Sequence, residues 1–278
     1  NGTRNMIIKC ASRQFKKGDV LHWWHEGFAD GLPRGVRTMI SDDRLFLPLA
    51  ACEYAEVSGD AAIFDEQIPY LVNTEIPYGQ QNIYCEMERS DDTETLYEHC
   101  CRAVELSFEL RGAHGLPLMG TGDWNDGMDA VGWDGGESVV VGWLLLLAAR
   151  ALLPVCKKRG DTARAMLFER ESAALRAVIE SNAWDKNRYI RAFFGDGTSL
   201  GSADCSECAV DCVSECFAVF ANAVHAREAF ETVLAALTDP VNGLIRLLSP
   251  PFDGKTRNAV GYLAKAAEAN WGEFIQIS

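Results

Sequence analysis

The sequence lacks three features that would indicate a nucleic-acid-binding, membrane-spanning or multidomain protein. Basic residues are scarce: 26 Lys and Arg stand against 40 Asp and Glu, and the formal net charge of −14 argues against nucleic acid as a partner. The longest apolar run, 139–149, is shorter than the roughly 20 residues that span a bilayer, so we expect a buried helix there. No Pro-, Gly- or Ser-rich linker divides the chain, which predicts one domain and no membrane segment.

The start of the chain lacks an initiator Met and an apolar signal core. We therefore expect a fragment of a longer protein, with no export signal in this part. Cysteine is plentiful, with ten residues, but disulfide scaffolds are typical of short secreted chains. Because Cys52, Cys100 and Cys156 lie in apolar helical segments, we expect a reducing, cytoplasmic setting.

Motifs of several enzyme classes are also absent. The sequence contains neither the GxxxxGK[ST] phosphate loop nor a strand-linked GxGxxG, and Gly120-Thr121-Gly122 lacks the third glycine. It contains no GxSxG nucleophile turn. Nucleotide-dependent and serine-hydrolase functions are therefore not expected.

Two clusters contain metal-ligating residue types, but their spacing does not suit a metal. His22 and His25 have no Cys nearby and no second ligand pair. If residues 205–216 form one helix, their four cysteines extend over about 16 Å, too far to meet at one zinc ion. We predict no metal site and interpret these cysteines as small core-facing residues.

Helical periodicity dominates the chain and predicts an all-α fold with a minor β-hairpin. The apolar spacing predicts helices at 42–57, 92–110, 138–158, 162–182, 210–224 and 226–237. Ser41 is the expected cap of the first of these helices, and Gly59 follows its end. The hairpin is expected at 189–200, and the loops at 13–40, 78–90 and 112–137 are expected to carry the site.

The densest cluster of polar functional groups is the segment 120–129, which combines three aspartates, Asn125 and Trp124 between glycines. An aromatic face stacks on a pyranose ring, while amides and carboxylates bind its hydroxyl groups. One carboxyl, kept protonated by burial or by a like-charged neighbour, then donates to a leaving oxygen. The alternative is a purely structural turn, since Asn-Asp-Gly is ordinary turn material.

A second cluster lies nearer the N-terminus, with His22-Trp23-Trp24-His25 followed by Arg37 and Asp43. Arg37 and Asp43 are six positions apart, across the entry to a predicted helix, so both can face one cavity. Together they offer a donor and an acceptor for the hydroxyl groups of a sugar. The tryptophans are explained equally well by packing in a core.

The order of these motifs resembles glycoside hydrolase family 94. The match extends over roughly residues 13–262, and its shared motifs lie at 13–15, 18–25, 34–43, 58–71, 114–127, 136–138 and 249–253. The family comprises inverting phosphorylases for cellobiose, chitobiose and β-1,2-glucans, and the phosphorylase-like domains of cyclic β-1,2-glucan synthases. The resemblance implies an (α/α)6 barrel, or toroid, which is incomplete here because the sequence predicts too few helices.

The resemblance also implies site roles. Asp126 is the general acid, Arg37 and Asp43 hold the sugar in the −1 subsite, and Trp124 lines the same pocket. An inverting hydrolase needs two carboxyls, whereas a phosphorylase needs one, because inorganic phosphate is itself the nucleophile. The implied substrates are an oligosaccharide or β-glucan and inorganic phosphate, with no cofactor and with α-glucose 1-phosphate as product. The segments 114–129 and 249–253 favour β-1,2-glucan, with cellobiose-type specificity as the alternative.

The sequence departs from the family pattern in its last part. Beyond Gly261-Tyr262 the family continues to Glu-Asn-Gly-Gly and a phosphate-binding His, but here only Ala269-Asn270-Trp271-Gly272 echoes that motif, so the phosphate-binding residues stay unknown. Glu215 and Phe217 replace the usual Gln and Trp of the family. Two alternatives follow: a catalytically inactive fragment or sugar-binding remnant, and an inverting hydrolase on the same barrel.

Overall fold

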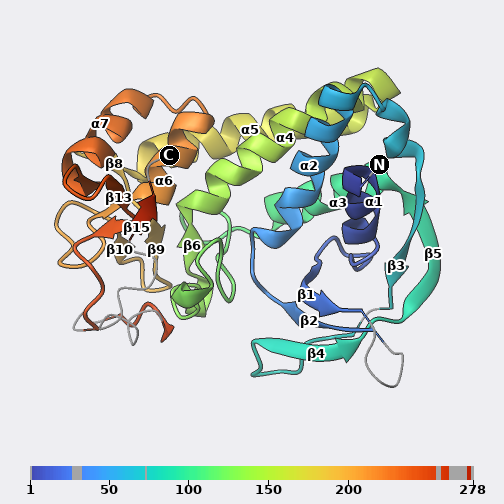
Figure 1. Ribbon diagram of the computed structural model, residues 1–278, viewed down its shortest axis with the longest axis horizontal. Coiled ribbons are helices and arrows are strands. Elements are labelled where there is room, and N and C mark those ends of the chain that lie inside the picture. The colour runs from blue at the N-terminus through green and yellow to red at the C-terminus, as the bar shows by residue number, and fades with distance from the viewer. Residues whose placement is uncertain (1, 27–32, 73, 255–257, 263–273, 277–278) are drawn as a thin grey trace. The chain divides into compact units, whose positions relative to one another are not determined.

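The computed structural model describes residues 2–26, 33–72, 74–254, 258–262 and 274–276 (Figure 1). The chain divides into two compact units. Unit 1 comprises residues 1–110 and 147–172, and unit 2 comprises residues 111–146 and 173–278. Two long helices, α4 (Val139–Arg159) and α5 (Thr162–Asn182), contribute residues to both units.

Unit 1 contains the helices α1 (Gly2–Ala11), α2 (Asp43–Ser58) and α3 (Leu96–Glu109). The predicted end of α2 is confirmed, because Gly59 adopts a left-handed φ of 75° and donates its N–H to Ala55. The predicted cap is wrong: Asp42 occupies the N-cap position, and Ser41 lies buried one residue earlier. Helix α1 was not predicted, because it buries only Ile7 and Ala11 and so has a weak apolar stripe.

Unit 1 also contains strands, which makes the expectation of an all-α fold wrong. An antiparallel sheet has the order β1 (Leu21–His25), β2 (Arg34–Thr38) and β4 (Asn82–Glu86). A second pair joins β3 (Gln67–Leu71) to β5 (Arg89–Thr95), so the helix expected at 92–110 begins only at Leu96. These strands are short and many of their side chains are exposed or half-buried, so they carry little apolar alternation. For that reason they resemble loops in the sequence.

The core of unit 1 lies between α2 and α3, where Leu45, Ala51, Leu96 and Val104 are fully buried. A short 3-10 helix, η1 (Ala61–Asp65), follows α2 and packs on both helices. All ten cysteines of the chain are free thiols, and Cys52, Cys100 and Cys156 are buried. Their placement in buried helical positions agrees with the sequence prediction.

Unit 2 is assembled from short strands around two helices, α6 (Cys212–Phe220) and α7 (Ala226–Leu237). The predicted hairpin is confirmed, since β9 (Ala192–Phe193) pairs with β10 (Ser199–Leu200) and also with β6 (Glu137–Ser138). The remaining strands are β7 (Trp184–Asp185), β8 (Arg188–Tyr189), β11 (Val210–Asp211), β12 (Thr238–Asp239), β13 (Leu244–Arg246), β14 (Leu248–Ser249) and β15 (Phe274–Gln276).

The helix expected at 210–224 is shorter than predicted. Val210 and Asp211 pair with β14, and α6 begins only at Cys212. Cys205 and Cys208 therefore precede the helix, and the argument that the four cysteines lie along one helix is wrong for these two. The core of unit 2 packs beneath the loop 120–129; its buried members include Met119, Met128, Val131, Val140, Ala192, Leu248, Phe252 and Val260.

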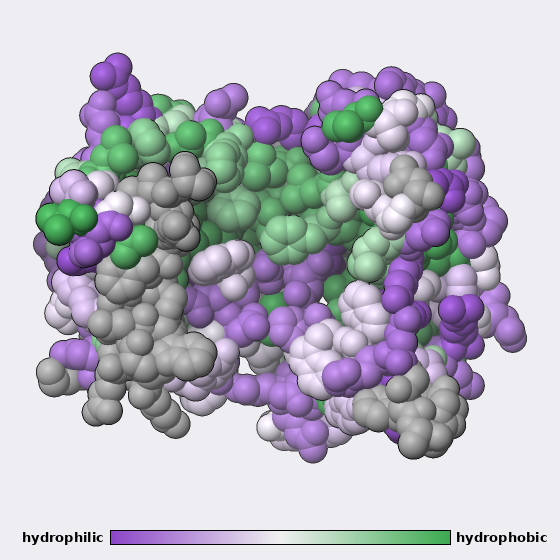
Figure 2. All heavy atoms as spheres, viewed as in Figure 1, coloured by the Kyte–Doolittle hydropathy of each residue, from purple (hydrophilic) through white to green (hydrophobic). Residues whose placement is uncertain are grey.

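Helix α4 is the buried helix expected from the apolar run. By length and composition it is the one described helix that could cross a membrane, and 67% of its most apolar window is buried inside the protein, as in a core helix. Trp143 and Leu145 on this helix are fully buried. Figure 2 shows hydrophilic side chains over much of one face, with apolar side chains gathered where Figure 1 draws α2 and α4.

Candidate functional site

The segment 120–129, here called the acid loop, lies in unit 2 and is shaped by local hydrogen bonds. The Asn125 N–H donates to Asp123 Oδ1 at 3.1 Å, and the Gly127 N–H donates to Asn125 Oδ1 at 3.0 Å. Asn125 thereby caps the short 3-10 helix η2 (Asp126–Met128). Gly122 has a φ of 143°, which favours glycine. The acid loop is thus a pair of Asx turns, as the structural alternative predicted, and this geometry is compatible with a catalytic role.

The fully buried carboxylate of the acid loop is Asp123, not Asp126. Arg191 donates to both oxygens of Asp123, from its two terminal nitrogens at 2.7 and 2.5 Å, and the Ser138 hydroxyl donates at 2.6 Å. Burial by itself raises the pKa of Asp123, but the Arg191 guanidinium and these hydrogen bonds outweigh it and hold the pKa below its usual range. Asp123 is therefore ionised and unsuited to proton donation.

Asp126 is the first residue of η2 and is exposed, as is the neighbouring Trp124 with 44% of its surface accessible. Burial therefore does not keep the carboxyl of Asp126 protonated in this structure, contrary to one of the two mechanisms considered from the sequence. Partial burial, then the negative charges of Asp126 and Asp129, raise the pKa of the Tyr262 hydroxyl, which places both carboxylates near one group.

The segment 258–262 closes against the acid loop. The Tyr262 N–H donates to Asp129 Oδ1 at 2.9 Å, and the Ala130 N–H donates to the Val260 carbonyl at 3.3 Å. Gly261 has a φ of 128°, and a Cβ atom there would overlap the Asp129 carboxylate and the Gly127 carbonyl. Only glycine fits this approach. The family echo at 269–272 lies outside the described residues.

The base of the loop 112–137 is held by Glu137, a residue that the sequence did not single out. Its buried carboxylate accepts the backbone N–H groups of His114 and Leu116, both at 3.0 Å, and contacts His114 Nδ1 at 2.5 Å. The His114 ring stacks on Phe193 with centroids 3.9 Å apart. These contacts fix the chain that leads into the acid loop.

Helix α6 carries a second group of buried acids. Asp211 caps the helix by accepting the N–H groups of Val213 and Ser214, and burial raises its pKa despite the nearby Arg191. Glu215 is 1% exposed, and burial raises its pKa to about 9 although it accepts the Tyr189 N–H at 2.9 Å. Glu215 is thus uncharged at neutral pH. A protonated carboxyl has nearly the shape of the Gln side chain that the family resemblance leads us to expect at this position.

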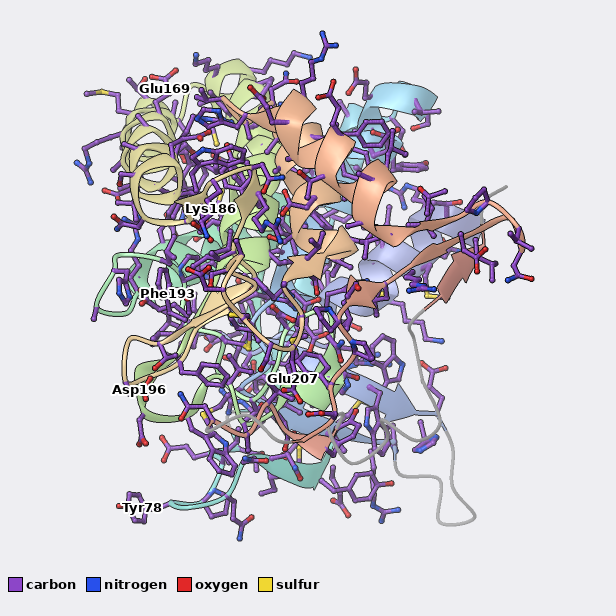
Figure 3. The ribbon with its side chains drawn as sticks, turned by 90° about the vertical axis from the view of Figure 1, so that its left-hand side faces the viewer. Tyr78, Glu169, Lys186, Phe193, Asp196 and Glu207 are labelled. Carbon is purple, nitrogen blue, oxygen red and sulfur yellow. The ribbon has the colours of Figure 1, made fainter. Side chains whose placement is uncertain are left out.

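Two acidic residues of unit 2, Glu207 and Asp196, hold the end of the family-like segment 249–253 and the chain that follows it; both are labelled in Figure 3. The buried Glu207 carboxylate accepts the N–H groups of Asp253 and Gly254 at 2.7 and 2.8 Å. Asp196, in the turn of the β9–β10 hairpin, accepts from the Asn258 side chain at 3.1 Å. The sequence suggested neither role, because both partners are distant in the chain.

The two sugar-binding candidates Arg37 and Asp43 lie in unit 1 and have local partners. Arg37 on β2 donates from Nε to Asp19 at 2.6 Å and from a terminal nitrogen to the Thr74 carbonyl at 2.6 Å. Its guanidinium lies 3.8 Å from the centroid of the Phe15 ring. Asp43, the first residue of α2, lies 3.0 Å from His22 Nδ1.

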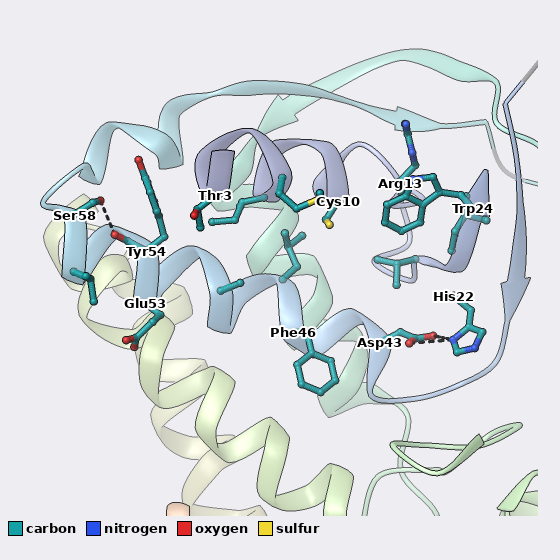
Figure 4. A pocket seen from close by; sticks show the side chains of 17 residues that line it. Thr3, Cys10, Arg13, His22, Trp24, Asp43, Phe46, Glu53, Tyr54 and Ser58 are labelled. Atoms are coloured by element: carbon teal, nitrogen blue, oxygen red, sulfur yellow. Dashed lines mark hydrogen bonds and ion pairs between the residues drawn. The ribbon is translucent and has the colours of Figure 1, made fainter. Parts of the chain in front are cut away.

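A cavity of about 890 Å³ opens in unit 1 between α1, α2 and β1 (Figure 4). Arg13, His22, Trp24 and Asp43 line one end of the cavity, Thr3, Glu53, Tyr54 and Ser58 line the other, and mostly apolar side chains lie between them. Arg37 is not among its lining residues in the described part of the chain, so the expectation that Arg37 and Asp43 face one cavity is not met for this cavity. Among the described residues, no cluster of His, Cys, Asp or Glu has an arrangement that could hold a metal ion.

The structure thus brings Trp124 and Asp126 together in unit 2, and it describes Arg37 and Asp43 separately in unit 1. Sequence analysis missed Arg191, His114 and Glu137. A signal for Arg191 was present, since it is a lone charge among the apolar residues that begin the predicted hairpin. Such a residue is rarely buried without a paired carboxylate.

Comparison of this chain with known proteins identifies a matching family. Residues 1–270 match the sequence model of the family described as Glycosyl hydrolase 94 superfamily, catalytic domain. The chain is 38% identical over 264 residues to the cyclic beta-(1,2)-glucan synthase NdvB of Rhizobium meliloti, covering 94% of this chain and 9% of that protein. It is 35% identical over 258 residues to the 3-O-beta-D-glucopyranosyl-beta-D-glucuronide phosphorylase of Paenibacillus borealis, covering 91% and 31%.

A more distant relative is the N,N'-diacetylchitobiose phosphorylase of Vibrio furnissii, 26% identical over 276 residues, or 90% of this chain and 32% of that one. The chain therefore spans about a third or less of the length of these curated relatives. Among solved structures, a GH78 family rhamnosidase of Bacillus sp. GL1 matches with a TM-score of 0.50 and 17% identity, over 73% of this chain and 18% of that chain. This last likeness is one of fold alone.

Proposed function

This chain belongs to the glycosyl hydrolase 94 superfamily, as part of its catalytic domain, and we propose that it serves an inverting glycoside phosphorylase or glucan synthase acting on β-linked glucosides. The observation that carries the proposal is the difference in burial between Asp123 and Asp126 in the acid loop. Asp123 is buried and paired with Arg191, while Asp126 is exposed beside the exposed ring of Trp124. One loop therefore presents an exposed carboxyl and an exposed aromatic ring on which a sugar can stack.

In the proposed reaction, a glucosyl unit stacks on Trp124 and its glycosidic oxygen approaches Asp126. Inorganic phosphate attacks the anomeric carbon from the opposite face, the bond from that carbon to the leaving oxygen breaks, and Asp126 delivers its proton to that oxygen. The product is α-glucose 1-phosphate, and the acid regains a proton from the solvent or from the next phosphate. No cofactor is required.

The pairing of Asp123 favours phosphorolysis over hydrolysis. An inverting hydrolase needs a second carboxylate as general base for water, and the buried carboxylate of the acid loop, Asp123, is occupied by Arg191 and Ser138. Inorganic phosphate needs no such base, because it is already an anionic nucleophile. The residues that bind phosphate remain unassigned.

We further propose that Arg37 and Asp43 hold the sugar in the −1 subsite of an (α/α)6 barrel to which this chain contributes a part. Asp43 supports this role because it lines the unit 1 cavity together with Trp24 and His22. Specificity for β-1,2-glucan is supported by the 38% identity to the glucan synthase over 94% of this chain. The free thiols are compatible with a cytoplasmic location.

Phosphate dependence tests the proposal. The protein is incubated with β-1,2-glucooligosaccharides, and in parallel with cellobiose, in the presence and absence of inorganic phosphate, and α-glucose 1-phosphate is measured. We expect release only with phosphate, faster from the β-1,2-linked substrate, and a loss of about 100-fold or more in Asp126→Asn. Asp134→Asn, an exposed carboxylate just beyond the acid loop, is the matched control and should keep full activity.

Any other result of this experiment supports one of the alternative functions or another acid. Equal turnover in phosphate-free buffer indicates an inverting hydrolase. Sugar binding without turnover under any condition indicates the inactive or sugar-binding remnant. Full phosphorolysis by Asp126→Asn would show that another group is the acid.

A further inference from the structure

A completely buried ion-pair cluster connects the acid loop to two segments that are distant in sequence. Arg191 is 0% exposed and lies between Asp123 of the acid loop and Asp211, which caps α6. Both carboxylates are also buried. Such a cluster in the interior of unit 2 requires a reason, because removing three charged groups from water is costly.

The contacts of Arg191 with its two carboxylates are unequal. With Asp123 it forms two parallel hydrogen bonds, at 2.7 and 2.5 Å. With Asp211 its Nε makes an ion pair at 3.3 Å that lacks hydrogen-bond geometry. The hydrogen bonds of Asp211 serve the first turn of α6 instead, through the N–H groups of Val213 and Ser214. The guanidinium is therefore oriented chiefly toward the acid loop.

The backbone of Arg191 is fixed as firmly as its side chain. Its N–H donates to the Leu200 carbonyl at 2.7 Å, and its carbonyl accepts from the Val139 N–H at the start of α4 at 3.3 Å. Gly201, with a φ of 90°, packs so closely that a Cβ atom there would overlap the Arg191 backbone. The guanidinium thus has a rigid origin in the hairpin, which makes it a fixed reference point for the acid loop.

Asp126, the proposed acid, is only three residues from Asp123, the carboxylate that Arg191 holds. Asp123 Oδ1 also accepts the Asn125 N–H, and Asn125 caps the turn that begins with Asp126. A displacement of the Asp123 carboxylate therefore moves the turn that carries the acid. Asp126 is the first residue of this turn, so its backbone moves with the turn.

We propose that Arg191 is a positioning residue for Asp126, acting through Asp123 to hold the acid loop in the geometry needed for proton transfer. This inference rests on the proposed function, because it assigns a purpose to the position of Asp126. Arginine is required at this position, since its planar fork matches both oxygens of a carboxylate, whereas the single ammonium group of lysine does not.

Hydrogen exchange of the acid-loop amides tests the inference on the free protein and needs no turnover. In Arg191→Lys and in Asp123→Asn, which is nearly isosteric, we expect the amides of residues 125–128 to exchange at least about 10-fold faster. Where phosphorolysis is measured, we expect kcat to fall about 100-fold, with KM changed less than about 3-fold, because misplacement of the acid affects chemistry more than binding.

Two controls separate positioning from general destabilisation. Asp211→Asn keeps the helix cap and leaves the Asp123–Arg191 hydrogen bonds in place, so acid-loop exchange should match that of the unaltered protein. Arg44→Met removes another fully buried arginine, in unit 1, where it donates to Ser107, and it should also leave acid-loop exchange unchanged.

The inference is overturned if Arg191→Lys and Asp123→Asn leave exchange at residues 125–128 unchanged, or if Asp211→Asn accelerates it equally. It is likewise overturned if these variants keep their full kcat. Failure of the proposed function is a distinct result: it appears as turnover without phosphate, as no turnover, or as full phosphorolysis by Asp126→Asn, whatever the exchange rates of the loop.

Discussion

The arginine–carboxylate sites of the two units differ in their exposure to water. In unit 2, Arg191 and Asp123 are both 0% exposed. In unit 1, the side chain of Asp19, which pairs with Arg37, is 18% exposed, and the His22 and Asp43 side chains are 22% and 21% exposed. The unit 2 site is therefore built for a fixed geometry. In unit 1, by contrast, Arg37 is buried, but its partner Asp19 and the His22–Asp43 pair are partly accessible to water.

The physical reason is the cost of an unpaired buried charge. Removing one partner of a buried pair leaves a charge that water cannot reach, whereas a partly exposed carboxylate is rehydrated. A proton donor benefits when a buried ion pair holds its loop, because the distance from the donor to the leaving oxygen must not vary. A sugar-binding group benefits from partial exposure, because its hydrogen bonds must be released to the substrate.

The largest effect expected at neutral pH is on stability, in matched substitutions of the two arginines. Arg191→Met should lower the free energy of unfolding by roughly 3–5 kcal/mol, because Asp123 is left charged and buried. Arg37→Met should cost about 1–2 kcal/mol, because Asp19 remains partly hydrated. Urea unfolding followed by circular dichroism measures both. Equal losses of unfolding free energy in the two variants would show that the two arginine–carboxylate pairs do not differ in their dependence on burial.

A second, pH-dependent effect is expected at Glu215 in the interior of unit 2. Its pKa is about 9 in the folded protein, against an ordinary value of 4.5. Below pH 4.5 the carboxyl is protonated in both states. As the pH rises toward 9 only the unfolded state ionises, so the folded protein loses roughly 1.4 kcal/mol of stability for each pH unit.

The substitution Glu215→Gln removes the loss of stability that Glu215 causes as the pH rises. Its advantage in free energy of unfolding should be near zero at pH 4.5, reach roughly 3 kcal/mol at pH 7 and level off above pH 9. Glu228→Gln, at an exposed position on α7, is the control and should change stability little at any pH. A pH-independent effect of Glu215→Gln would mean that the Glu215 carboxyl titrates normally in the folded protein.

The smallest effect is expected at the rim of the unit 1 cavity. His22→Gln removes the contact between His22 Nδ1 and Asp43, and because both side chains are about one-fifth exposed, the free energy of unfolding should change by less than about 1 kcal/mol. Thermal unfolding checks this value. A loss of several kcal/mol would show that the unit 1 pair is as structural as the Arg191 cluster.

Much of the helical framework was predictable, because its signals are local. Helix α5 has the predicted bounds, although it buries Ala165, Phe168, Leu175 and Ile179 instead of the stripe expected from the sequence. Helix α7 buries Ala229, Val233 and Leu237 at the expected spacing, and Gly59 ends α2 as its αL conformation requires. The strands of unit 1 were not predictable. Strand β5, for example, consists largely of charged and hydroxyl residues and is defined by pairing with β3 rather than by its own composition.

In the acid loop, too, some features were predictable from the sequence and others depended on the tertiary structure. Its composition, its Asx turns and its likeness to one enzyme family are properties of a few adjacent residues, so the sequence by itself determined them. Only the tertiary structure decided that Asp123 is the buried carboxylate and Asp126 the exposed one, because Arg191 comes from a hairpin 68 residues away in the chain. It likewise decided that Glu215 is uncharged, since burial depends on every segment packed around a group.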